Sequence, residues 1–194
     1  VDLGDVRVGD LAQATLSVAN TAIDDGFSEN LDLSFTGNNT GAVSGTGGMI
    51  DDLGPQASDN TSLTVTLDTS AGGAINGTAE LQQTSDGNGV NLLGQTSLGT
   101  ADVAVNADVF RLANPDPAAT TVAAGDAHVG GTLSVAIDIA NSVPADGFSE
   151  TLNAGFTGTN TGNVTGTAGA IANLASGNSD NSSMSIQLDT ASAG

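Results

Sequence analysis

The sequence repeats itself with a spacing of 121 residues and without a gap. Residues 25–29 read Asp-Gly-Phe-Ser-Glu and reappear in the same order at 146–150, and residues 1–73 align with 122–194 throughout. A fixed period without insertions is typical of arrays built from one structural unit, and such arrays usually serve as scaffolds, stalks or filaments. The sequence is therefore more informative about architecture than about a specific activity.

The repeat predicts two domains. The first is 1–121, with a Pro-bearing linker at about 113–121, and the second is 122–194, an incomplete copy that matches 1–73. Because this second copy has no counterpart of two predicted strands, we expect it to expose sheet edges and one side of a core. Either the array is longer, or 74–194 forms one full domain and 1–73 is completed by a neighbouring chain through strand addition. Both alternatives predict head-to-tail association.

Apolar and polar residues alternate with period two along most of the chain, as at Leu31, Leu33 and Phe35. This period is typical of half-buried strands. Seven strands are predicted in the first copy, near 2–8, 12–20, 30–36, 49–53, 61–68, 77–84 and 101–112. The connectors between them, including 37–41, 44–48 and 85–89, are rich in Gly and polar residues. The pattern predicts an all-β fold of tandem immunoglobulin-like antiparallel β-sandwich repeats.

The net charge limits the partners. The chain has a formal charge of −20, from 22 acidic residues against two Arg and no Lys. Nucleic acid is excluded as a partner because phosphate backbones require clustered cations, and an anionic membrane would repel the chain. No apolar stretch is long enough for a membrane-spanning helix, so no membrane insertion is expected. The predicted partners are further copies of the chain in a homopolymer, with calcium or neutral glycans as alternatives.

Catalytic residues are scarce. The chain has no Cys and a single His, His128, and it lacks Trp and Tyr. Disulfides and thiolate sites are therefore excluded, a phosphate-binding loop with its Lys is excluded, and a sugar-stacking cleft is disfavoured. We predict that the protein is not an enzyme and needs no cofactor.

The repeated Asp-Gly-Phe-Ser-Glu segment has one candidate binding function. Carboxylates and carbonyls in a tight loop are the oxygen ligands that calcium prefers. The candidate metal ligands are Asp25, Glu29, Asp146 and Glu150. The alternative is structural: Asp and Gly shape a turn while Phe27 or Phe148 enters the core. Asp24 is replaced by Ala145 in the second copy, which weakens a two-carboxylate site.

Residues 3–9 read Leu-Gly-Asp-Val-Arg-Val-Gly and precede an alternating run that ends at 18–21. This segment resembles the opening of the ASH/major-sperm-protein-like immunoglobulin domains. With 25–29, 67–69, 77–79 and 109–113, the fuller pattern is similar to the choice-of-anchor D repeats of bacterial surface and secreted proteins. The second copy departs from the opening pattern at Ala124 and Ala127. The resemblance implies an extracellular or cell-surface repeat without catalytic residues.

The function predicted from the sequence is that of an extracellular structural repeat protein. It would form or extend a filament, sheath or adhesin stalk by head-to-tail association through β-strand complementation. The alternative is a calcium-dependent adhesion or ligand-binding module of a surface protein, in which acidic turns hold the cation.

Overall fold

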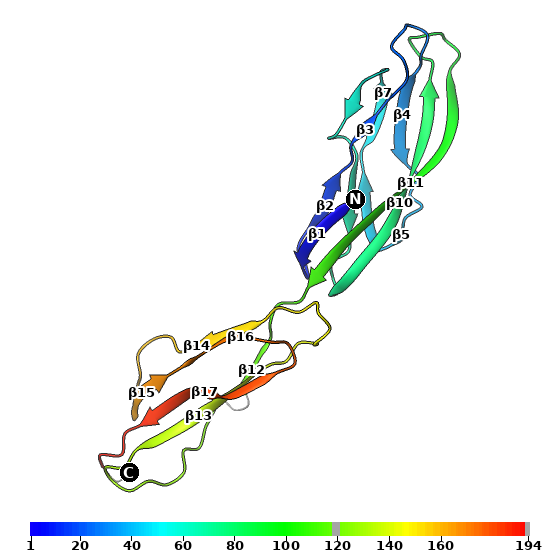
Figure 1. Cartoon of the computed structure of the whole chain (residues 1–194). Helices are drawn as coiled ribbons and strands as arrows, with labels where there is room; N and C mark the ends of the chain where they lie inside the picture. The colour runs from blue at the N-terminus through cyan, green and yellow to red at the C-terminus, as the bar shows by residue number, and fades with distance from the viewer. Residues whose placement is uncertain (118–120, 193–194) are drawn as a thin grey trace. The chain divides into compact units, whose positions relative to one another are not determined.

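The computed structural model describes residues 1–117 and 121–192, and these residues form strands and loops with no helix. The all-β prediction is therefore confirmed, and the fold is sandwich-like. The chain divides into two compact units, Val1–Phe110 and Arg111–Gly194, here called unit 1 and unit 2 (Figure 1). Because there is no helix in the described part, none of it is a helical membrane span.

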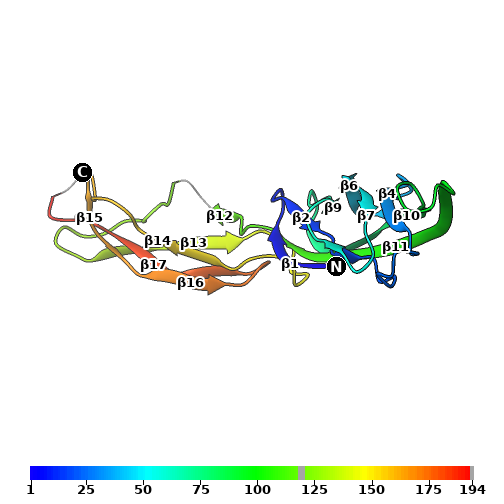
Figure 2. The same ribbon diagram turned by 90° about the horizontal axis from the view of Figure 1, so that it is seen from above.

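Unit 1 contains eleven strands. They are β1 (Asp2–Arg7), β2 (Ala12–Thr15), β3 (Val18–Ala19), β4 (Asn30–Phe35), β5 (Thr40–Gly41), β6 (Val43–Gly47), β7 (Met49–Leu53), β8 (Ser58–Asp59), β9 (Thr64–Leu67), β10 (Gly73–Asp86) and β11 (Gln95–Phe110). One sheet has the order β1-β11-β10-β4-β7, with β5 also paired to β10, and a second has the order β2-β9-β6 (Figure 2). β3 and β8 form a further pair. All pairings are antiparallel except that of β1 with β11, which is parallel.

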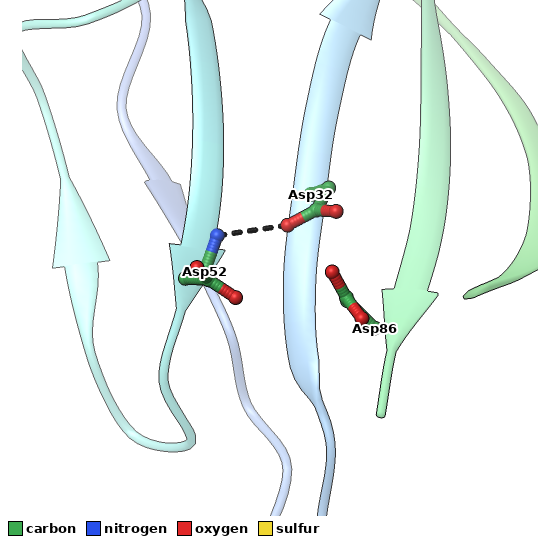
Figure 3. Close-up of side chains that lie close together, drawn as sticks. All are labelled: Asp32, Asp52 and Asp86. Carbon is green, nitrogen blue, oxygen red and sulfur yellow. Dashed lines mark hydrogen bonds between the residues drawn. The ribbon is translucent and has the colours of Figure 1, made fainter. Parts of the chain in front are cut away.

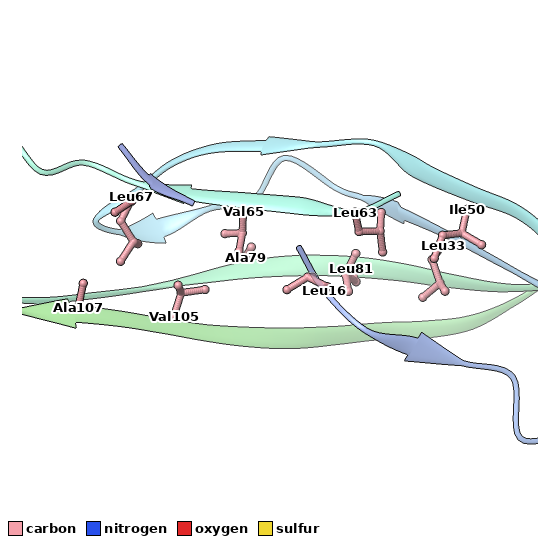
Figure 4. Packing of buried hydrophobic residues seen from close by; sticks show 11 residues of the cluster. Leu16, Leu33, Ile50, Leu63, Val65, Leu67, Ala79, Leu81, Val105 and Ala107 are labelled. Atoms are coloured by element: carbon pink, nitrogen blue, oxygen red, sulfur yellow. The ribbon is translucent and has the colours of Figure 1, made fainter. Parts of the chain in front are cut away.

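The core of unit 1 lies between the two sheets (Figure 4). β9 contributes Val65 and Leu67, which are 0% and 3% exposed. β10 and β11 face them with Ala79, Leu81, Val105 and Ala107, all exposed by 5% or less. Because alternate residues of each strand point into the same layer, the period-two pattern of the sequence becomes a thin aliphatic core.

The described residues of unit 2 form six strands. They are β12 (Pro115–Pro117), β13 (Leu133–Asn141), β14 (Leu152–Gly155), β15 (Val164–Ala168), β16 (Ala170–Leu174) and β17 (Ser179–Leu188). The first sheet has the order β12-β13-β17-β15, and β14 pairs with β16. Among the described residues of this unit, the buried apolar ones are Val143, Leu152, Ile171 and Met184. Within its described residues, no strand takes the place that β10 and β11 have in unit 1.

The same side-chain hydrogen bonds recur within each of the two units, at positions that lie 121 residues apart. The Asn20 side chain donates to the carbonyl oxygens of Glu29 (3.2 Å) and Leu53 (2.9 Å). The Asn141 side chain donates to those of Glu150 (3.0 Å) and Leu174 (3.2 Å). Both Asn residues are buried, so each amide satisfies backbone carbonyls that would otherwise lack partners away from water.

Several segments differ from the prediction. Of the predicted connectors 37–41 and 85–89, residues 40–41 form β5 and residues 85–86 end β10. The Gly-rich connector at 44–48 lies largely in β6, which pairs with β9. The predicted strand at 12–20 is divided into β2 and β3, although its counterpart β13 is continuous. In the predicted linker, Pro115–Pro117 form β12 at the edge of a sheet, where a residue without an N–H is tolerated. The rest of the linker includes 118–120, which lie outside the described residues.

Candidate functional site

The repeated Asp-Gly-Phe-Ser-Glu segment forms the same turn in both units. Asp25 Oδ1 accepts a hydrogen bond from the Phe27 N–H, and Asp146 Oδ1 accepts one from the Phe148 N–H, both at 3.0 Å. The glycines between them have φ of +80° and +88°. The turn reading of these Asp residues is confirmed, but Phe27 does not enter the core: it is 88% exposed. Phe148 is half-buried.

The acidic members of this segment have partners within their own units. Asp146 forms an ion pair with Arg111 at 2.7 Å, and its pKa is lowered first by the Phe148 N–H and then by Arg111. Glu29 accepts hydrogen bonds from the side chains of Ser85 (2.5 Å) and Asn91 (2.7 Å), which lower its pKa. In unit 2, the backbone of Glu150 bonds to Arg111 and Asn141. Each of these contacts helps to hold a turn or a loop in its conformation.

Among the described residues, one cluster of acidic side chains is compact enough to bind a single cation. The cluster contains none of the four predicted ligands. Oxygens of Asp32, Asp52 and Asp86 lie within 4.8 Å of one another (Figure 3). The Gln95 amide donates to Asp32 (3.0 Å) and Asp86 (3.1 Å). Burial raises the pKa of Asp32, whereas hydrogen bonds from the Asn88 N–H and then from Gln95 lower that of Asp86.

Backbone geometry accounts for two members of this acidic group. Asp32 Oδ1 accepts the Asp52 N–H at 2.8 Å, and in unit 2 Asn153 Oδ1 accepts the Asn173 N–H at 2.7 Å. Asp52 and Asn173 have φ of +59° and +55°, a left-handed conformation that Asp and Asn tolerate better than other side chains do. Asn occupies both positions in unit 2. The geometry common to the two units therefore uses an accepting side-chain oxygen at 32 and 153 and a left-handed residue at 52 and 173, and it does not require a charge.

Asp180 should make the stability of unit 2 depend on pH. Hydrogen bonds from the Ser183 hydroxyl, the Ser182 N–H and the Ser183 N–H lower its pKa to about 2. Because this folded-state pKa lies below the unfolded value of about 3.9, the carboxylate stabilises the fold above about pH 4, and this contribution is lost as the pH falls towards 2. We expect Asp180→Asn, which keeps an acceptor oxygen, to unfold with a smaller dependence on pH between 4 and 2 in urea titrations. A wild-type slope in the variant would contradict this assignment.

An apolar opening lies in unit 2. It is a groove of about 390 Å³, here called the open groove, lined by Val122, Val135, Ile137, Phe156, Val164, Ile186 and Leu188. None of these side chains carries a charge or a hydrogen-bonding group. Val122 and Phe156 are 42% and 37% exposed, and the strand residues among them are half-buried. Apolar surface of this kind, gathered in one place, is typical of an interaction site.

The counterparts of the groove residues in unit 1 show why the groove is open. Leu16, Val65 and Leu67, the counterparts of Ile137, Ile186 and Leu188, are 5%, 0% and 3% exposed. In unit 1 the second layer of the core is made by β10 and β11. The described residues of unit 2 thus present the same interior face, and among them no strand lies in the position that β10 and β11 have in unit 1.

No protein-family model matches the chain, and no characterised protein is significantly similar to it. The geometry of the chain itself therefore carries the functional argument.

Sequence reasoning anticipated an uncovered core side in the second copy but did not identify the residues that line it. The signal was present in the alignment of the repeat. Val135, Ile137 and Ile186 are large apolar residues at positions where unit 1 has Ala14, Leu16 and Val65. Apolar volume is thus kept or increased on the face that lines the open groove.

Proposed function

We propose that the protein is an extracellular structural repeat protein, built of tandem immunoglobulin-like sandwiches, that assembles head-to-tail into a filament, sheath or adhesin stalk. The observation that carries the proposal is the repetition itself: the Asp-Gly turn and the hydrogen bonds of the buried Asn recur in unit 2 at positions 121 residues from those of unit 1. Apolar surface of a neighbouring repeat would find its partner in the open groove of unit 2. Burial of apolar surface stabilises by about 25 cal/mol per Å², so a face of this kind favours association over exposure to water.

Other features support a structural role. The described acidic side chains with resolved hydrogen bonds mostly cap turns, as Asp59 and Asp180 do for the N–H groups two and three residues later. The near absence of Lys and Arg leaves trypsin-like proteases few cleavage points, which suits an exposed fibre. The resemblance to repeats of bacterial surface proteins favours the same location.

The proposal is tested by the mass of the chain in solution. We expect light scattering after size exclusion to show oligomers that grow with protein concentration, and we expect Phe156→Asp, which places a charge in the open groove, to reduce the mass to that of a monomer. Phe27→Asp is the matched control, because Phe27 is exposed, lies outside the groove and introduces the same charge. A wild-type chain that is monomeric at every concentration would overturn the proposal.

Two additional arms of this experiment sharpen it. Copies with a charge of −20 repel one another, so added salt should strengthen an association driven by apolar contact. Adding EDTA should leave the mass unchanged. A mass that falls with EDTA and recovers with calcium would instead support the calcium-dependent adhesion module.

A further inference from the structure

Residues 111–117, here called the leading segment, belong to the first copy of the sequence repeat but to unit 2 of the structure. The second sequence copy begins at 122, whereas unit 2 begins at Arg111. The leading segment is attached to unit 2 at three successive places, which are the Asp-Gly-Phe-Ser-Glu turn, the buried Asn141 and the edge of β13. The structural unit is therefore offset from the sequence copy that it contains, and it uses the end of the copy before it.

Arg111 makes the first attachment, at the turn. Its N–H donates to the Phe148 carbonyl and its carbonyl accepts the Glu150 N–H, both at 2.9 Å. The backbone of Arg111 thus forms a short parallel bridge with Ser149. Its guanidinium group pairs with Asp146 at 2.7 Å. One residue therefore contributes two backbone hydrogen bonds and an ion pair to the same turn.

Asn114 and β12 make the other two attachments. The Asn114 N–H donates to the side-chain oxygen of Asn141 (3.2 Å), and the Asn114 carbonyl accepts the Ser142 N–H (2.9 Å). The Asn114 side chain donates to the Ser142 hydroxyl at 2.8 Å. β12 then pairs with β13, and this pairing ends with Pro117 opposite Ile139. The leading segment thus becomes an additional edge strand of unit 2.

The turn of unit 1 has the same geometry as that of unit 2 but lacks these contacts. Asp25 accepts the Phe27 N–H as Asp146 accepts that of Phe148, yet no cation among the described residues forms an ion pair with Asp25. The Phe27 carbonyl and the Glu29 N–H have no hydrogen-bond partner among the described residues. Phe27 is 88% exposed, whereas Phe148 is half-buried.

The other two receiving positions are also present in unit 1. The side-chain oxygen of Asn20, the counterpart of Asn141, accepts the Ala22 N–H at 3.1 Å and retains a second lone pair for a donor placed like the Asn114 N–H. β3 corresponds to the part of β13 that pairs with β12, but among the described strands it pairs only with β8. Unit 1 therefore offers all three positions that hold the leading segment in unit 2.

We propose that unit 1 receives a copy of the leading segment from the end of the preceding repeat in the array. The occupant is an extended segment with an arginine three residues before an Asn, as in Arg111 and Asn114. Its arginine pairs with Asp25, and its backbone adds to the turn and then to the edge of β3. This inference rests on the proposed function, because it names the contact by which successive repeats join.

The proposal gives the repeated Asp-Gly-Phe-Ser-Glu segment a role beyond its own turn. Arg111 is one of only two basic residues in a chain with 22 acidic ones, and its guanidinium pairs with this turn. An arginine followed by a short edge strand is a specific signal in such a chain, because few other segments carry a positive charge. The turn thus selects the segment that precedes each unit.

The test uses a fluorescent peptide with the sequence of residues 110–117, capped at both ends and titrated with the full-length chain. The peptide has one Arg and one Asp, so the charge of −20 on the chain does not attract it without specificity. We expect the anisotropy to saturate at one peptide per chain, because the turn of unit 2 already holds Arg111. Amide hydrogen exchange should show new protection at Glu29 and at 18–19, and none at 148–150.

Two changes isolate the ion pair. Asp25→Asn keeps an acceptor for the Phe27 N–H but loses the charge, so it should weaken peptide binding about two- to fivefold, as expected for an exposed ion pair. A peptide with Arg111→Gln should lose the same factor, and the two changes together should cost little more than either alone. Asp24→Asn is the matched control: the same charge is lost at the neighbouring exposed residue, whose counterpart in unit 2 is Ala145, and binding should stay at the wild-type level.

Equal peptide binding by the wild type and Asp25→Asn would overturn the inference, as would protection that appears outside the turn and β3. Absence of binding at millimolar peptide would also overturn it. None of these results changes the mass of the chain in light scattering, so the proposed assembly is judged separately. A chain that binds the peptide at Asp25 but stays monomeric at every concentration would overturn the proposed assembly and support the turn as the receptor for the arginine.

Discussion

Leu67→Ala should destabilise unit 1 by about 2–5 kcal/mol, whereas Leu188→Ala, the same change at the counterpart position, should cost unit 2 only a small fraction of that. Leu67 is 3% exposed and packs in the core that β10 and β11 close. Leu188 lines the open groove and is half-buried, so its removal leaves a wider groove rather than an enclosed cavity.

The comparison requires each unfolding transition to be assigned to its unit. Urea unfolding followed by circular dichroism gives the change in midpoint, and amide hydrogen exchange shows which unit has lost protection. The measurement belongs at low protein concentration, where association does not stabilise unit 2. Equal losses in the two variants would mean that the face of unit 2 is closed in solution and that the open groove is not a free surface.

Gly48→Ala should have an effect at least as large, a loss of about 4 kcal/mol or more in unit 1. Gly48 has a φ of +84°, and a Cβ atom there would clash with the carbonyl oxygen of Ser62. Because the obstacle is backbone on the neighbouring strand connection, the chain can relieve the clash only by separating β6 and β7 from it. Gly169 has the same contact with Ser183 in unit 2, which predicts the same sensitivity there.

Gly9→Ala separates the two causes of this loss. Gly9 has a φ of +87° but has no atom within 4 Å of an added Cβ, so it reports the cost of the left-handed conformation alone, about 1–2 kcal/mol. The difference between the two variants in urea midpoint then measures the clash. A Gly48→Ala protein no less stable than Gly9→Ala would show that the Ser62 carbonyl is able to move away.

The strands that the sequence predicted best are those in which burial alternates. Val65 and Leu67 point into the core, and Thr64 and Thr66 point away from it. The alternation of apolar and polar residues in the sequence therefore matches the alternation of the two faces of the sheet. β6 was missed because its residues, Val-Ser-Gly-Thr-Gly, have the composition of a turn. It is a strand because β9 offers it a row of backbone partners, and this pairing is a tertiary effect that local composition does not encode.

The candidate sites show the same difference between local effects, which the sequence predicts, and tertiary effects, which it does not. The Asp-Gly turn was predictable because an Asp side chain bonds its own backbone two residues later, a purely local effect. The exposure of Phe27 was not predictable from the sequence. The surrounding strands determine the direction in which the side chain of a turn residue points. The sequence analysis did not single out the exposed Leu92 and Leu93, although a Leu-Leu pair in a segment rich in Gly and Asn breaks its polar pattern.

The parallel pairing of β1 with β11 has a mechanical consequence. Asp2 lies opposite Asn106, and Arg7 lies opposite Phe110, so the first and last strands of unit 1 run side by side in the same direction. A stretching force applied between residue 1 and residue 110 would pull these strands lengthwise past each other. The hydrogen bonds between them would then bear the load together rather than break one after another, as in a peeled hairpin. In a fibre under tension, this arrangement would make the ends of unit 1 a clamp that gives way only when the whole ladder does.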